Sequence, residues 1–201
     1  MCGIFGVVGS KKKISFIKVN KLIDKFFILS QKRGSDASGI YFQSQDDSSI
    51  YKKVISPKKF IKLKNYKKFK KDNYFQCKDS FSFLGQCRLA TYGNKNQNSN
   101  NQPIQVNDLT CVFNGHITNL EEKINNEKFN DFSDTELLLK NIDKNRIVED
   151  NENHFNKTTD KFSGIINLLF TKNNSNILYL FSNNGSIFFT DIDGTYLFAS
   201  E

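Results

Sequence analysis

The chain has 201 residues, of which 38% are hydrophobic. This length and apolar content suffice to bury a core, which excludes a disordered tail and indicates a globular protein. Lys and Arg number 29 against 21 Asp and Glu, a formal net charge of +8. A positive balance can indicate a nucleic-acid or acidic membrane partner. Because Lys and Asn are abundant throughout the loops, we interpret it as a compositional bias of the surface.

The four cysteines are scattered and form no CxxC pair, so neither a zinc-finger nor a redox spacing is present. We interpret Cys77, Cys87 and Cys111 as packing residues. The first apolar run, residues 4–8, is too short to span a bilayer or to form a signal-peptide core, and no later run reaches membrane length. We therefore expect a soluble, cytoplasmic protein.

The first quarter of the chain predicts a strand, a helix and two more strands. Residues 2–8 are apolar and β-branched, which predicts a buried strand at the very start of the chain. Apolar residues at helical spacing predict a helix over 14–32, and the glycine- and serine-rich segment 33–39 ends it as a tight loop. Strands are expected at 39–42 and 50–55.

Residues 56–71 predict a second helix, with Ser56 as N-cap and Pro57 at the first helical position. Ten lysines lie between Lys52 and Lys71, interleaved with Phe60, Ile61, Tyr66 and Phe69. Such interleaving is found in proteins that grip single-stranded nucleic acid. It is equally typical of an amphipathic helix whose aromatic side chains enter the core while its lysines stay in water. We favour the solvated face.

The remaining elements are mostly strands. Segments 81–89 and 109–113 predict two of them, and Ser133 followed by Asp134 and Glu136 predicts the start of a helix. The last third alternates strand-like segments with turns, at 165–170, 177–181, 187–190 and 196–199. The whole pattern predicts a strand-rich α+β domain.

Cys2 is the first candidate for chemistry, because removal of Met1 would leave a free α-amine beside its thiol. A thiol with a pKa near 8.5 is only a few per cent ionised at neutral pH, and an α-amine with a pKa of about 7.7–8.0 can accept its proton. One residue would then supply nucleophile and base, with no histidine required. Taken alone, however, Cys2 is better interpreted as a small buried hydrophobe at a strand start.

The opening MCGIFGVVG resembles that of the class II glutamine amidotransferases, the N-terminal-nucleophile family. Six further blocks resemble those of the family, in the family's order: RGSDASG (33–39), GQCRLATYG (85–93), NQPI (101–104), VFNGHITN (112–119), SDTELL (133–138) and FASE (198–201). Together they cover essentially the whole chain. Gln86, Leu89 and Tyr92 depart from residues common in the family, so the branch stays open.

The resemblance implies a catalytic set. Cys2 would be the nucleophile, and the Asn114 side chain and the Gly115 backbone N–H would form the oxyanion hole. A glycine at 115 lets the backbone approach the substrate closely. Without the neighbouring blocks, the same pair would describe a plain Asn-Gly turn.

The resemblance also implies a set of substrate-binding residues. Arg88 would clamp the α-carboxylate of glutamine and Asp134 would take its α-ammonium group, so that opposite charges read the two ends of the amino acid. Thr91 would add a hydrogen bond to the carboxylate. Arg33 and Gly34 would belong to the loop over the nucleophile. An aspartate at a helix start is also a common capping residue.

The family fold is a four-layer αββα sandwich, in which two antiparallel sheets lie between helices. We expect residues 1–201 to be a single domain that hydrolyses L-glutamine to L-glutamate and ammonia through a thioester on Cys2. The half-reaction implies no metal or cofactor. In the family, ammonia passes to a synthase domain, and a synthase subunit or domain is the expected partner here. Because residues 1–201 contain no such domain, three possibilities stay open: the synthase is a separate polypeptide, the reading frame is truncated or split, or the domain acts alone.

Two alternatives stay open. The chain could be a stand-alone hydrolase of other γ-glutamyl amides, for which free glutamine is a poor substrate. It could instead be a catalytically inactive regulatory or nucleic-acid-binding module that uses the face between Lys52 and Lys71. The retention of every residue that glutamine hydrolysis needs favours the glutaminase, with neither nucleic acid nor membrane as a partner.

Overall fold

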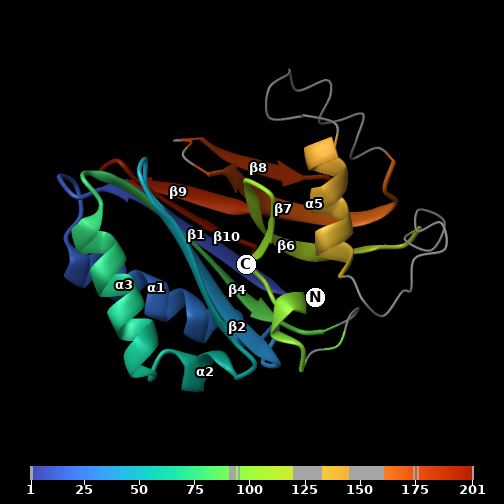
Figure 1. Cartoon of the computed structure of the whole chain (residues 1–201), viewed down its shortest axis with the longest axis horizontal. Helices are drawn as coiled ribbons and strands as arrows, with labels where there is room; N and C mark the ends of the chain where they lie inside the picture. Colours follow the sequence, from blue (N-terminus) through green and yellow to red (C-terminus); the bar gives the residue numbers. More distant parts are fainter. Residues whose placement is uncertain are drawn as a thin grey trace.

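Two antiparallel sheets packed face to face form the centre of this computed structural model (Figure 1), which describes residues 2–90, 94, 96–119, 133–144, 161–173, 175 and 177–200. The larger sheet has the strand order β3-β2-β4-β1-β10-β9 and the smaller the order β5-β6-β7-β8. The six strands of the larger sheet are β1 (Gly3–Ser10), β2 (Ala37–Gln43), β3 (Ser48–Lys53), β4 (Ser80–Arg88), β9 (Phe188–Ile192) and β10 (Thr195–Ala199). The smaller sheet comprises β5 (Ile104–Val106), β6 (Leu109–Ile117), β7 (Gly164–Lys172) and β8 (Leu178–Ser182).

Helices cover the outer face of each sheet (Figure 1). Those on the larger sheet are α1 (Phe16–Ser30), α2 (Pro57–Phe60) and α3 (Lys64–Gln76), and α5 (Asp134–Lys144) packs on the smaller one. A short 3-10 helix, η1 (Asn98–Asn100), precedes β5. In the part of the chain that the structure describes, no helix is long and apolar enough to cross a membrane.

Three separate apolar cores lie between the four layers of helices and sheets. Successive side chains of a strand point to opposite faces, so in β1 Phe5 and Val7 pack against the helices while Ile4 packs against the other sheet. Leu138 and Leu139 of α5 belong to the third core, beneath the smaller sheet. The αββα sandwich expected from the sequence is therefore confirmed.

The helix expected over residues 56–71 is wrong, because the structure has two helices there, α2 and α3. Phe60, Ile61 and Leu63 all pack against the core. Residues two apart lie on opposite sides of a helix, so one straight helix could not turn both Ile61 and Leu63 inward. The break between α2 and α3 resolves that conflict. The short β5 and η1 were not expected at all.

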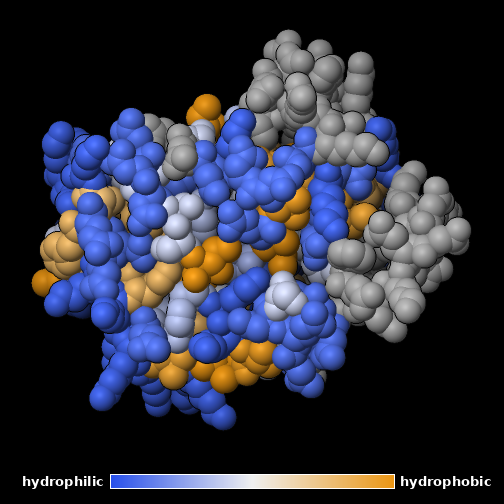
Figure 2. Space-filling model, viewed as in Figure 1, coloured by the Kyte–Doolittle hydropathy of each residue, from blue (hydrophilic) through white to orange (hydrophobic). Residues whose placement is uncertain are grey.

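The lysine-rich segment forms a mostly solvated face, with its aromatic residues turned inward. Phe60 and Tyr66 are fully buried, and the surface over α2 and α3 shows many hydrophilic side chains with hydrophobic ones between them (Figure 2). The exposed lysines are Lys53, Lys58, Lys59, Lys62, Lys64, Lys67, Lys68 and Lys71. The expectation of lysines in water is wrong for Lys70, which is fully buried. Its Nζ lies 2.5 Å from Asp24 Oδ1 and 4.2 Å from the centre of the Tyr66 ring.

Candidate active site

Cys2 lies at the start of β1, which is flanked in the sheet by β4 and β10. Gly3 pairs with Cys87 in the β1–β4 ladder, so the chain start is held beside the end of β4. The Cys2 thiol donates to the carbonyl oxygen of Leu89, at a sulfur–oxygen distance of 3.6 Å. Burial raises the pKa of the Cys2 thiol, and the Asp134 carboxylate raises it further. The thiol therefore needs a proton acceptor to become a nucleophile at neutral pH.

A small pocket brings the chain start together with the ends of several elements. It is lined by Cys2, Arg88, Leu89, Asn100, Gln102, Phe113, Gly115, Ser133, Asp134 and Thr135. Its free volume is about 10 Å³, close to what a single water molecule requires.

Arg88, the last residue of β4, supplies the positive charge of this pocket. Its side chain is almost fully buried, and its Nη1 donates to Asn101 Oδ1 at 2.5 Å. The loop before β2 is held against the backbone of Arg88 and its neighbours. The Asp36 N–H donates to the Arg88 carbonyl oxygen at 2.9 Å, and the Ala90 N–H donates to Asp36 Oδ2 at 3.0 Å. A Cβ on Gly34 would lie 2.3 Å from the Arg88 carbonyl carbon. Only glycine fits this close approach.

Asp134 supplies the negative charge, from the first turn of α5. The helix is capped by Ser133, whose Oγ accepts the Glu136 N–H at 3.1 Å, as in a capping box. The Asp134 carboxylate is therefore not the N-cap group. It is buried, and that burial raises its pKa, although the Thr135 N–H donates to Oδ1 at 2.7 Å. A buried carboxylate of this kind favours a cationic ligand group.

Gln102 ties the pocket walls to one another. Its Oε1 accepts the Phe113 N–H of β6 at 2.6 Å, and its Nε2 donates to Thr135 Oγ1 of α5 at 2.9 Å. The loop before β5 thus fixes the smaller sheet and the start of α5 relative to each other. Among the described residues, no three His, Cys, Asp or Glu side chains gather as a metal site would require.

The structure brings together four of the eight residues predicted for the site: Cys2, Arg88, Gly115 and Asp134. Gly34 lies behind the wall, against the Arg88 backbone. Asn114 is buried beside Gly115 but does not line the pocket, and no described group donates to its Oδ1. Arg33 lies in the turn after α1, where its N–H donates to the Ser30 carbonyl oxygen, and does not line the pocket either. Thr91 lies outside the described residues.

Sequence reasoning missed several wall residues: Asn100, Gln102, Phe113, Ser133 and Thr135. Each lies within or next to one of the blocks NQPI, VFNGHITN and SDTELL. The blocks therefore contain the signal, but residues without a charge or an obvious reactive group do not stand out within them.

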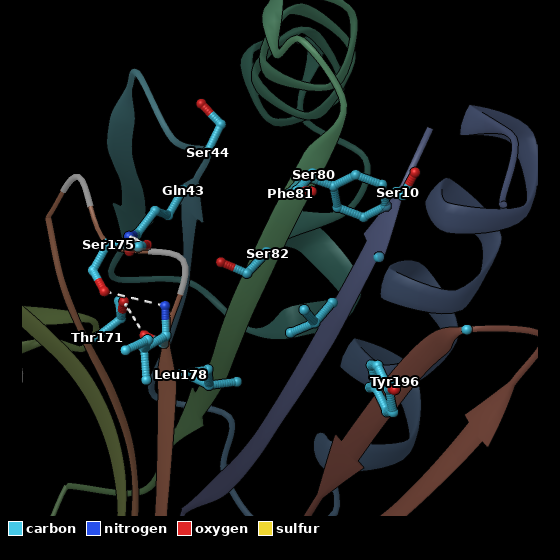
Figure 3. A pocket seen from close by; sticks show the side chains of 14 residues that line it. Ser10, Gln43, Ser44, Ser80, Phe81, Ser82, Thr171, Ser175, Leu178 and Tyr196 are labelled. Carbon is cyan, nitrogen blue, oxygen red and sulfur yellow. Dashed lines mark hydrogen bonds between the residues drawn. The ribbon is translucent and has the colours of Figure 1, made fainter. Parts of the chain in front are cut away.

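A larger cavity, of about 310 Å³, lies at the other end of β1, between the ends of the two sheets (Figure 3). Its lining is rich in hydroxyl side chains, including Ser10, Ser82 and Thr171, and its described residues include neither a cysteine nor a charged side chain. Several of these polar groups already have partners: Ser10 Oγ donates to Asp79 Oδ1 at 2.6 Å and Thr171 Oγ1 to the Ile177 carbonyl oxygen at 2.9 Å. Although this cavity is larger, its described side chains lack the reactive and charged groups of the pocket beside Cys2, so we do not take it as the candidate active site.

The fold and the pocket beside Cys2 together define an αββα protein of the N-terminal-nucleophile hydrolase type. Residues 86–201 match the glutamine amidotransferase domain family, and the chain belongs to that family. This confirms the family expected from the sequence, with the class II fold. No curated protein sequence matches the chain.

Two solved structures share the fold at low sequence identity. One is the glutamine phosphoribosylpyrophosphate amidotransferase of B. subtilis in complex with ADP and GMP, with a TM-score of 0.65 and 17% identity. The other is described as the allosteric regulatory enzyme of purine biosynthesis, with a TM-score of 0.64 and 16% identity. Each alignment covers 99% of this chain, and the chain spans 42% of each of those proteins.

Proposed function

We propose that this chain is a glutaminase domain that hydrolyses L-glutamine to L-glutamate and ammonia, with Cys2 as the nucleophile after removal of Met1. The observation that carries the proposal is the meeting of a thiol, a buried guanidinium and a buried carboxylate in one pocket. An α-amino acid with a side-chain amide offers a complementary group to each of the three.

Substrate binding uses the two charges. Arg88 pairs with the α-carboxylate of glutamine, for which a planar guanidinium is well suited. Asp134 pairs with the α-ammonium group, a positive charge that suits its buried carboxylate. With the two ends fixed, the γ-carboxamide extends toward Cys2.

The first chemical step forms a thioester. The α-amine of Cys2 accepts the thiol proton, and the sulfur attacks the γ-carboxamide carbon. Negative charge develops on the amide oxygen, where the Gly115 N–H and the Asn114 side-chain amide stabilise it, each such donor contributing about 3–4 kcal/mol. The carbon–nitrogen bond then breaks, and ammonia leaves with the proton held by the amine.

The second step releases glutamate. Water attacks the γ-glutamyl thioester carbon while the α-amine takes one of its protons, and that proton returns to the departing sulfur. Because burial raises the pKa of the Cys2 thiol, the adjacent amine is needed to ionise it in the first step. Neither step requires a metal or a cofactor. Thr91, Arg33 and Gly34 keep their proposed roles around the substrate and the nucleophile.

We place the whole of residues 1–201 in one glutaminase domain, which delivers its ammonia to a synthase domain or subunit in the cytoplasm. The two solved structures described above are more than twice as long as this chain. The name of the B. subtilis protein includes an acceptor, phosphoribosylpyrophosphate, which supports the idea of a separate acceptor site.

The first experiment is an assay of glutamate release from L-glutamine by the purified chain, with the intact mass recorded to establish loss of Met1. We expect release by the wild type and none by Cys2→Ala, which keeps the α-amine but lacks the sulfur. Cys77→Ala is the matched control, because Cys77 is a buried cysteine packed with the helices of the larger sheet, and it should stay active.

Release that persists in Cys2→Ala would refute the nucleophile. A correctly trimmed wild type that releases no glutamate from glutamine, but cleaves L-γ-glutamyl anilides, would replace the proposal with the hydrolase of other γ-glutamyl amides. Inactivity toward both substrates would contradict the enzyme itself.

A further inference from the structure

The Lys52 side chain spans from β3 to the loop that forms one wall of the candidate active site. Its Nζ donates to the Asn101 carbonyl oxygen at 2.6 Å and to that of Pro103 at 3.0 Å. The loop also donates a hydrogen bond to the Lys52 backbone, from Asn98 Nδ2 to the Lys52 carbonyl oxygen at 3.2 Å. One lysine thus holds the loop on both sides of Gln102.

The sheet beneath the loop is shaped for this contact. Gly39 of β2 is the residue paired with Lys52, and a Cβ on Gly39 would lie 2.0 Å from the Gln102 carbonyl oxygen. A side chain at position 39 would therefore push the loop off the sheet. With glycine there, the loop backbone lies directly on β2, within reach of the Lys52 ammonium group.

The same loop holds both of the charges that face the pocket. Asn101 Oδ1 accepts from Arg88 Nη1, and Gln102 donates to Thr135, the neighbour of Asp134. Movement of the loop backbone would therefore shift the guanidinium first, because Asn101 contacts it directly.

We propose that Lys52 is a positioning residue for glutamine binding: by fixing the 98–103 loop, it holds Arg88 in place for the substrate α-carboxylate. This inference rests on the proposed function. Lys52 touches neither the thiol nor the pocket interior, so it acts through Asn101 and Arg88 rather than on the reacting atoms.

The charge of Lys52 supports the same role. Burial and the nearby Arg88 lower the pKa of Lys52 to about 8, against the opposing influence of Cys111 and Glu136. The ammonium form still predominates at neutral pH. It therefore makes charge-assisted hydrogen bonds to the loop carbonyls and adds positive potential on the side where the substrate carboxylate would bind.

The test compares Lys52→Met with Lys52→Arg and with Lys53→Met. Lys53 is the exposed next residue of β3, so Lys53→Met removes one positive charge from the same strand without touching the loop. Methionine keeps most of the stem of Lys52, and each variant is checked for an unchanged unfolding temperature.

We expect Lys52→Met to raise the KM for L-glutamine about tenfold, since the loop loses its charge-assisted hydrogen bonds, with kcat changed less than about threefold. Binding of the carboxylate is common to ground and transition states, which is why KM carries the effect. Lys52→Arg should have a KM close to that of the wild type, and Lys53→Met should match the wild type. The rate of Cys2 alkylation by iodoacetamide, which has no carboxylate, should be the same in all four proteins.

An unchanged KM in Lys52→Met, or a fall in kcat and in alkylation rate together, would overturn the inference while leaving the proposed function intact. Absence of glutamate release by the wild type would refute the proposed function, and the inference with it. The two failures are thus distinguishable in one set of assays.

Discussion

At Asp134, the chain keeps a carboxylate in a buried position where Ser133 already supplies the helix cap. Burial raises the pKa of Asp134, so the folded state binds a proton there more tightly than the unfolded chain does. Stability that depends on this group is therefore lost as the pH rises through its folded pKa, and the charged form lowers stability at neutral pH. A side chain selected for stability alone would not be charged here.

We expect Asp134→Asn to weaken L-glutamine binding by at least about 30-fold, because loss of one partner of a buried charge pair typically costs about 2–5 kcal/mol. The unfolding temperature should be equal to or higher than that of the wild type at about pH 7.5, and this gain should shrink toward about pH 4. Calorimetric titration, with Asp134→Asn placed in the inactive Cys2→Ala background, measures binding, and thermal unfolding across that pH range measures stability. A variant that unfolds at a lower temperature and still binds glutamine would show that Asp134 is a structural residue.

At the scale of elements, a buried charge also joins α1 to α3. Asp24 of α1 accepts from the fully buried Lys70 of α3 and from Tyr66, at 2.5 and 2.6 Å. Lys70 has no exposed side-chain surface, whereas that of Asp24 is 31% exposed. Removing Asp24 would therefore leave the buried Lys70 ammonium group without its carboxylate partner, while removing Lys70 would leave a carboxylate that water can reach.

This asymmetry predicts an unequal pair of mutations. Asp24→Asn should lower the free energy of unfolding by about 3–5 kcal/mol, the usual cost of breaking a buried ion pair, and Lys70→Met by less. The double variant should be more stable than Asp24→Asn alone, because methionine takes the lysine volume without its charge. Urea denaturation of the four proteins measures the cycle. Equal losses in the two single variants would argue against a desolvated lysine.

The sequence predicted most strands and the start of α5, because alternation along strands and capping residues are local signals. It failed between residues 56 and 71, where the packing of Ile61 and Leu63 on one core overrode a continuous helical pattern. The short β5 has too few residues to show a periodic pattern. In the site, the charged residues were found, but Gln102 was not, since its partners Phe113 and Thr135 lie 11 and 33 residues away and no spacing rule connects them.

At the scale of the whole molecule, the candidate site lies at one end of a sandwich whose two sheets differ in width. The apolar layer between them draws on β1, β2, β4 and β10 of the larger sheet and on β6 and β7 of the smaller one. The last strand of the larger sheet, β9, contributes no buried residue to that layer. All five of its side chains are exposed, including Phe188 and Phe189, so β9 is held mainly by its ladder with β10.

This uneven support predicts a gradient of local stability that falls from the site toward β9. Amide hydrogen exchange should be slowest in β1 and β4, which are buried and bonded on both sides, and fastest in β9, which has one bonded edge and little apolar contact. Exchange followed by mass spectrometry measures this on the purified chain at low concentration, with β10 as the internal reference because it pairs with both β1 and β9. Protection of β9 equal to that of β1 would contradict the gradient, and its loss on further dilution would show that another copy covers the exposed aromatic residues. A stable β1 beside a labile β9 would mean that the rigid part of the fold is the part that positions Cys2 and Arg88.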